Sequence, residues 1–299
     1  MSKSETYIQI FLDYLKFQKR YSQHTIISYQ NDLKDFFDFI DTQYGTLSMP
    51  EISTTFVRTW LAELKLKKIA SKSINRKIST LKSFFKYQLR KETIAATPMA
   101  TIVSLKVSKR LPGFIEEKEI ENLFNNVEFA DTWEGRTIRL ILQIFYLTGM
   151  RLNELINLKD SQIDYSNSNI KVLGKGNKER IIPVNKNLLF DIVNYKQDKI
   201  TKVLNIDTDH LLINEKGKKL QPKYVYNKVK EYLSKVTTNQ RKSPHILRHS
   251  FATHLTGNGA DINAVKELLG HSTLAATQIY THNSIEKLKE IHRRSHPKS

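Results

Sequence analysis

The chain has 299 residues, of which 39% are hydrophobic, so a folded core is expected and intrinsic disorder is excluded. Lys and Arg number 48 against 30 Asp and Glu, and the resulting net charge of +18 favours a polyanionic partner, above all nucleic acid. Cysteine is absent, which excludes disulfides and thiolate metal sites and fits a reducing cytoplasm.

The first third of the chain carries four helical patterns and begins without the apolar run of a signal peptide. Apolar residues recur at helical spacing within 8–15, 26–40, 56–64 and 74–89, and Ser22 is placed to begin the second helix. Residues 51–110 hold fourteen basic and three acidic side chains. We predict that one flank of the fourth helix faces DNA, an ordinary solvated helix face being the alternative. Its cations are Lys72, Arg76, Lys82, Lys86 and Arg90.

A linker is predicted at residues 106–113, because this segment is basic and contains the helix-breaking pair Pro112-Gly113. It separates an N-terminal domain of residues 1–105 from a C-terminal domain of residues 114–299. A flexible basic tether suits two domains that clamp a duplex between them.

The second domain mixes helices with one hairpin. Residues 138–147 are apolar nearly all round, which predicts a central buried helix, and this run is too short to span a bilayer. Two β-branched runs around a Gly-rich charged turn predict a hairpin over 170–184. Helical patterns follow at 186–204, 222–236 and 261–269, and a last helix carries Ile285, Leu288 and Ile291. The predicted fold class is therefore mainly α with a small β-sheet.

The stretch "SPHILRHSFATHL" at 243–255 combines an amphipathic helix with several polar groups that carry chemistry. Ser243 and Pro244 suit the start of a helix, and His245 and Arg248 lie three residues apart on one face. Leu247, Phe251 and Leu255 form a stripe that we expect to be buried. A metal site is disfavoured, because "HILRH" lacks the Glu of H-E-x-x-H and arginine is not a ligand.

Four further residues outside this stretch could take part in chemistry: an arginine, a lysine, a histidine and a tyrosine. Arg151 follows a glycine turn at a helix start, where phosphate is favoured, and Lys175 lies at the predicted hairpin tip. His271 follows the end of the 261–269 helix, and Tyr280 comes nine residues later. Each has an ordinary alternative, such as an ion pair between Arg151 and Glu154. The "GKGNKE" turn lacks the spacing of a nucleotide-binding P-loop.

Together these motifs resemble the tyrosine recombinase (phage integrase) family, and most of all its XerC/XerD type. The resemblance is densest in "TGMRLNELINL", "VLGKGNKERIIPV", "SPHILRHSFATHL" and "LLGHSTLAATQIYTH". The family pattern of Arg, Lys, His-x-x-Arg, His and Tyr is complete. It falls on Arg151, Lys175, His245, Arg248, His271 and Tyr280.

The resemblance implies a covalent mechanism that needs neither metal nor ATP. Tyr280 would attack a DNA phosphate to form a 3′-phosphotyrosyl bond, which stores the energy for religation. Arg151 and Arg248 would neutralise the oxygens of the phosphate, and Lys175 would protonate the leaving 5′ oxygen. The residues leave open how His245 and His271 divide proton transfer and hydrogen bonding.

By resemblance, four protomers exchange strands on two duplexes through a Holliday junction, which resolves chromosome dimers at a dif-like site. A second Xer-type recombinase and an FtsK-type DNA translocase are implied as partners, and the nucleoid as the place of action. Three alternatives remain: an integrase of a mobile element, a type IB topoisomerase, and a DNA-binding protein without cleavage activity.

Overall fold

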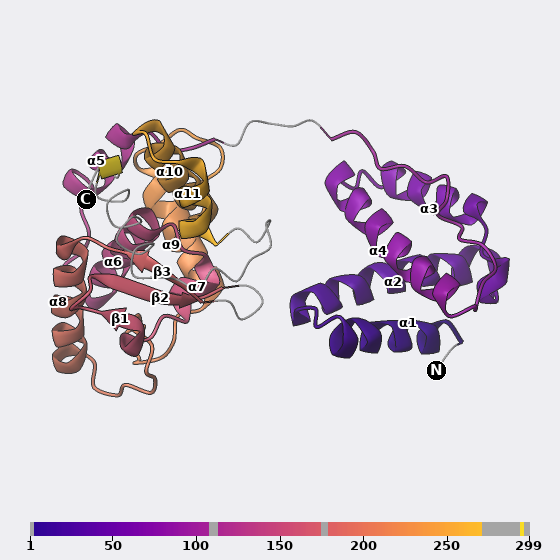
Figure 1. The fold of residues 1–299 in the computed structure, drawn as a ribbon, viewed down its shortest axis with the longest axis horizontal. Helices are drawn as coiled ribbons and strands as arrows, with labels where there is room; N and C mark the ends of the chain where they lie inside the picture. Colours follow the sequence, from indigo (N-terminus) through magenta and orange to yellow (C-terminus); the bar gives the residue numbers. More distant parts are fainter. Residues whose placement is uncertain (1–2, 108–112, 175–178, 271–293, 296–299) are drawn as a thin grey trace. The chain divides into compact units, whose positions relative to one another are not determined.

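The computed structural model describes residues 3–107, 113–174, 179–270 and 294–295 (Figure 1). Internal contacts divide the chain into two compact units, Met1–Arg110 and Leu111–Ser299. Each unit has a hydrophobic core of its own.

Helices build the described part of the N-terminal unit. They are α1 (Lys3–Asp13), the π-helical turn η1 (Tyr14–Gln18), α2 (Gln23–Tyr44), the 3-10 turn η2 (Met49–Glu51), α3 (Thr54–Leu66) and α4 (Ser71–Arg90). Ser22 caps α2 as predicted, its hydroxyl accepting from the Thr25 amide. Aromatic rings fill the core, where Phe36 lies edge-on to Trp60 and Phe85 at 5.1 and 6.2 Å.

The apolar side of α4 differs from the prediction in its last turn. Ile74, Ile78, Leu81 and Phe85 are buried, but Leu89 is 38% exposed. The buried face runs instead through Phe84 and Tyr87, whose rings pack against Phe11 of α1 at 5.4 Å. This contact ties the C-terminal end of α4 to the end of α1.

The C-terminal unit combines helices with a small sheet. Its described elements are α5 (Glu117–Asn125), α6 (Trp133–Thr148), α7 (Leu152–Ile156), η3 (Asp160–Gln162), β1 (Ile163–Asp164), β2 (Asn169–Leu173), β3 (Glu179–Pro183), α8 (Lys186–Lys202), α9 (Pro222–Ser234), α10 (Pro244–Gly257) and α11 (Ile262–Leu269). The sheet is antiparallel in the order β1-β2-β3, and β2 and β3 form the predicted hairpin.

Helix α6 is central to this unit, as its nearly continuous apolar sequence predicts (Figure 1). It packs against α8, α9 and α10. Gly149 ends it in the left-handed conformation, with φ 59°. A Cβ there would lie 2.5 Å from the Phe251 ring and 2.9 Å from Leu269, so only glycine allows α10 and α11 to approach this turn.

The prediction of a mainly α-helical protein with a small sheet is confirmed. Of the helices in the described ranges, none is both long and apolar enough to cross a bilayer. The tip of the hairpin and the predicted last helix lie outside the described residues.

Candidate active site

On helix α10, His245 and Arg248 of the "HILRH" motif differ in their exposure to solvent. The predicted stripe of Leu247, Phe251 and Leu255 is fully buried, which anchors the helix. His245 is exposed in the first turn, whereas Arg248 is 7% exposed. Ser243 occupies the N-cap position, as expected, although its side chain makes no capping hydrogen bond.

Backbone carbonyls hold the guanidinium of Arg248 in place. It donates to Gly149 O at 2.6 Å, in the turn after α6, and to Leu269 O at the end of α11. Burial lowers the pKa of Arg248 to about 9, and the charges of Arg151 and Arg180 contribute to this shift. The group therefore stays charged at neutral pH.

Arg151 lies on the other side of the same turn, as the N-cap of α7. Its guanidinium donates to Glu154 Oε1 at 2.8 Å and to Gly270 O at 3.0 Å. Its backbone N–H donates to Glu154 Oε2 at 2.7 Å. The ion pair with Glu154 therefore exists, and Glu154 holds Arg151 both by its guanidinium and by its backbone N–H.

A third arginine, which the sequence motifs did not single out, completes the cluster. Arg180 of β3 is 3% exposed and donates to both carboxylate oxygens of Glu154, at 2.8 and 2.7 Å. Its Nε donates to Leu268 O at 2.8 Å. A sequence signal exists: Arg180 and Ile182 are two residues apart on a strand, so their side chains lie on the same face, and both are buried.

Three consecutive carbonyls at the C-terminal end of α11 thus each receive one guanidinium. Leu268 O accepts from Arg180, Leu269 O from Arg248 and Gly270 O from Arg151. Cations stabilise the negative end of a helix, and these bonds satisfy carbonyls that lack helical partners. They fix the point from which the chain continues to His271.

Glu154 keeps the cluster together while leaving it positive. Burial alone would raise the pKa of Glu154, but the hydrogen bonds and charge of Arg180, together with Arg151, lower it to about 2. Three guanidiniums against one carboxylate give a net charge of +2. A phosphate is a suitable ligand for such a group, since guanidinium N–H pairs match its oxygens.

The remaining predicted catalytic residues, Lys175, His271 and Tyr280, lie outside the described residues. Lys175 belongs to the connection between β2 and β3, and β3 carries Arg180. His271 directly follows Gly270, whose carbonyl Arg151 binds. In the described ranges no group of three or more His, Asp or Glu is arranged to hold a metal ion.

The five cations of α4 have unlike surroundings. Lys72, Lys82 and Lys86 are exposed. Arg76 forms an ion pair with the fully buried Asp32 and donates to Ser28 Oγ at 2.7 Å. Arg90 is exposed and lies over the rings of Tyr14 and Tyr87.

Each of the two units matches a family of known proteins. The phage integrase family matches residues 113–287, and the phage integrase N-terminal SAM-like domain matches residues 8–92. The tyrosine recombinase XerC of Anoxybacillus flavithermus is 35% identical, with 98% of each chain covered. That of Listeria innocua is 38% identical, with 97% of each chain covered.

Solved structures share the fold. The XerH recombinase bound to a palindromic difH substrate after cleavage matches with a TM-score of 0.73 at 22% identity, covering 96% of this chain and 83% of that one. A lambda integrase dimer bound to a core site matches with a TM-score of 0.70 at 15% identity, covering 95% and 94%. The chain therefore belongs to the phage integrase family and is an enzyme of the site-specific tyrosine recombinase class.

Proposed function

We propose that this chain breaks and rejoins DNA at a specific site, with Tyr280 as the nucleophile. The observation that carries the proposal is the cluster of three guanidiniums at the end of α11, of which those of Arg180 and Arg248 are buried. Arg151 and Arg248, on different elements, meet there, at the start of the segment that contains His271 and Tyr280. All six members of the family pattern are present in the sequence.

The chemistry follows from the residue types. The phenolic oxygen of Tyr280 attacks phosphorus, and the bond from phosphorus to the 5′ oxygen breaks. Lys175 supplies the proton that this oxygen needs to leave, and the phenolic proton passes to a base, for which His245 and His271 are the two imidazoles of the set. Charge gathers on the non-bridging oxygens, where the arginines of the cluster stabilise it. A 5′ hydroxyl from a partner duplex then reverses the step.

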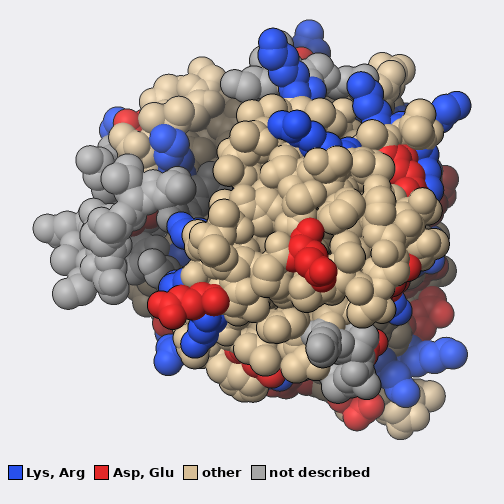
Figure 2. All heavy atoms as spheres, turned by 90° about the vertical axis from the view of Figure 1, so that its right-hand side faces the viewer, with Lys and Arg blue, Asp and Glu red and all other residues tan. Residues whose placement is uncertain are grey.

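DNA would be held between a core-binding domain of residues 1–105 and a catalytic domain of residues 114–299, joined by the basic segment 106–113. Figure 2 shows a face on which Lys and Arg lie mainly toward the margin, around a broad area that carries acidic side chains near its centre. The exposed Lys72, Lys82 and Lys86 of α4 are our candidates in the first domain.

The biological substrate we propose is a dif-like site at which chromosome dimers are resolved in the cytoplasm. Relatives named XerC at 34–38% identity over nearly the full chain support this assignment. Four protomers would act on two duplexes through a Holliday junction, alone or with a second Xer-type recombinase, and an FtsK-type translocase would activate them at the nucleoid.

A supercoiled plasmid with two copies of the cognate dif-like site tests the proposal. We expect products of recombination between the sites and an unchanged plasmid when the sites are scrambled. Relaxation of any plasmid would indicate a type IB topoisomerase, and DNA binding without a change in topology would indicate a protein without cleavage activity. Activity only on the ends of a mobile element would indicate an integrase.

A further inference from the structure

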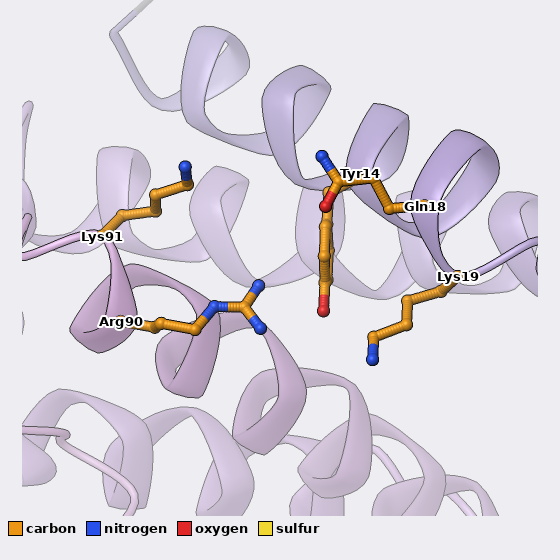
Figure 3. A pocket seen from close by; sticks show the side chains of 5 residues that line it. All are labelled: Tyr14, Gln18, Lys19, Arg90 and Lys91. Atoms are coloured by element: carbon orange, nitrogen blue, oxygen red, sulfur yellow. The ribbon is translucent and has the colours of Figure 1, made fainter.

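A hollow of about 470 Å³ lies on the N-terminal unit, where the turn η1 meets the C-terminal end of α4 (Figure 3). Its lining carries three cations and no carboxylate. The lining residues are Tyr14, Gln18, Lys19, Arg90 and Lys91.

The π-helical turn brings Tyr14 and Lys19 to this hollow. The Lys19 amide donates to Tyr14 O at 3.1 Å, a bond that spans five residues and makes the turn wider than in an α-helix. Arg20 follows with φ 52°, so the chain reverses directly after the turn. Such π turns are frequent at functional sites.

Two neighbouring tyrosine rings, tilted by 31° to each other, orient Arg90. The rings of Tyr14 and Tyr87 lie 4.7 Å apart, and the guanidinium carbon of Arg90 is 4.6 and 5.4 Å from their centroids. A guanidinium held on aromatic rings keeps its N–H groups available at its edge. In Figure 3 the Tyr14 hydroxyl lies between this guanidinium and the Lys19 ammonium.

Cations at the end of α4 also stabilise the helix dipole, which accounts for Arg90 and Lys91. The same role fits Lys19, the C-cap of η1, but it does not explain why a phenol lies between Arg90 and Lys19. Hydrogen bonding from Arg90 lowers the pKa of Tyr14, desolvation opposes this, and Lys19 adds a smaller lowering. Both cations therefore lie close to the phenolic oxygen, and an anion bound beside them would be attracted by both.

We propose that this pocket binds one phosphodiester of the DNA backbone. The fork of Arg90 suits two phosphate oxygens, with Lys19 and the Tyr14 hydroxyl as further donors. Exposed Lys82 and Lys86 precede Arg90 at four-residue steps of about 6 Å along α4, so the pocket ends a row of cations. The proposal rests on the proposed function, because it assumes that this unit contacts DNA, and adds where the contact is anchored.

Binding of labelled half-site duplex to the full chain tests the pocket. Arg90→Gln should weaken binding about tenfold or more, the value of a charge-assisted phosphate contact, and reduce the log–log salt slope by about 0.9. Tyr14→Phe keeps the aromatic ring beside Tyr87 and should cause a smaller loss. Lys65→Gln, an equal charge change at an exposed position of α3, should change affinity little. Thermal melting of each variant checks its fold.

Neutral methylphosphonates, placed one at a time along the duplex, then locate the contact. At one position the substitution should weaken the wild-type complex but not the Arg90→Gln complex. Equal affinity of Arg90→Gln and Lys65→Gln, with no such position, would overturn the proposal. So would unchanged half-site affinity with impaired loading of a second protomer, which would indicate that the pocket binds a carboxylate of a neighbouring chain. A wild-type chain that binds no duplex would refute the proposed function itself.

Discussion

Arg180 of β3 donates two parallel hydrogen bonds to the carboxylate of Glu154, at 2.8 and 2.7 Å, and both side chains are nearly inaccessible. The same guanidinium holds Leu268 O. The strand after the hairpin tip is thereby tied to α7 and to the end of α11. These bonds link the strand that follows Lys175 to the end of α11, where the next two carbonyls accept from Arg248 and Arg151.

Arg180→Lys should therefore impair cleavage more than DNA binding. A lysine keeps the charge but cannot make two parallel bonds and a third to Leu268 O. Small displacements of catalytic groups cost on the order of 10²-fold in rate, so we expect a loss of that order in the rate of covalent adduct formation. The rate is measured at saturating DNA and well below the melting temperature of the variant.

Lys171→Gln is the matched control, because Lys171 is an exposed residue on the same hairpin that pairs with Glu179. It should cleave at nearly the wild-type rate. Wild-type cleavage by Arg180→Lys would show that the ion pair has no part in positioning the site.

Protonation of Glu154 at low pH should lower the free energy of unfolding of the chain. Its folded pKa is about 2, below the ordinary value of 4.5, so its contribution is present above pH 4.5 and is lost as the pH falls toward 2. The shift corresponds to roughly 3 kcal/mol of unfolding free energy. Denaturant unfolding of the wild type should show this loss over that interval.

Glu154→Gln should be less stable than the wild type at neutral pH, because it breaks a buried ion pair. Its stability should depend less on pH between about 4.5 and 2. Parallel pH profiles of the two proteins would contradict the assignment of this pKa shift to Glu154.

The cations of α4 should separate into two classes. Lys82→Glu with Lys86→Glu should weaken DNA binding and leave the melting temperature unchanged, since both side chains are exposed. Arg76→Ala should instead lower the melting temperature, because buried Asp32 loses an ionic partner and keeps only Lys77 and Thr80. Unchanged affinity of the lysine double variant at moderate salt would remove this face from the DNA interface.

Lys175→Ala should lose roughly 10²–10⁴-fold in cleavage rate if its ammonium is the general acid. A substrate with sulfur in place of the leaving 5′ oxygen should restore most of this rate, because a thiol has a pKa of about 8.5 and leaves without a proton. Tyr280→Phe should be inactive on both substrates. Equal impairment of Lys175→Ala on oxygen and sulfur would assign Lys175 an electrostatic or positioning role.

Local signals in the sequence predict the helices that carry the site. Ser243-Pro244 and the apolar stripe at four-residue spacing define α10. Asp261 and Gly270 mark both ends of α11, with the Asp261 side chain accepting from the Asn263 and Ala264 amides. These features depend on neighbours a few residues away, so sequence reasoning finds them.

The pairing of Arg180 with Glu154 depends on tertiary structure. Twenty-six residues separate the two, and only the folding of the hairpin onto α7 and α11 brings them together. For the same reason the sequence places Arg76 among the DNA-facing cations of α4 without indicating its ion pair with Asp32 of α2. Side-chain spacing along one element does not specify which element packs against it.

Mapping the covalent bond is the most direct test of the proposed chemistry. The chain is mixed with a nicked duplex of its site, from which the cleaved strand end diffuses away, and the protein–DNA adduct is digested and analysed by mass spectrometry. We expect a 3′-phosphate linked to the peptide containing Tyr280, and no adduct with Tyr280→Phe although that variant still binds the duplex. An adduct on another residue, or one that persists in Tyr280→Phe, would contradict the assignment of Tyr280 as the nucleophile.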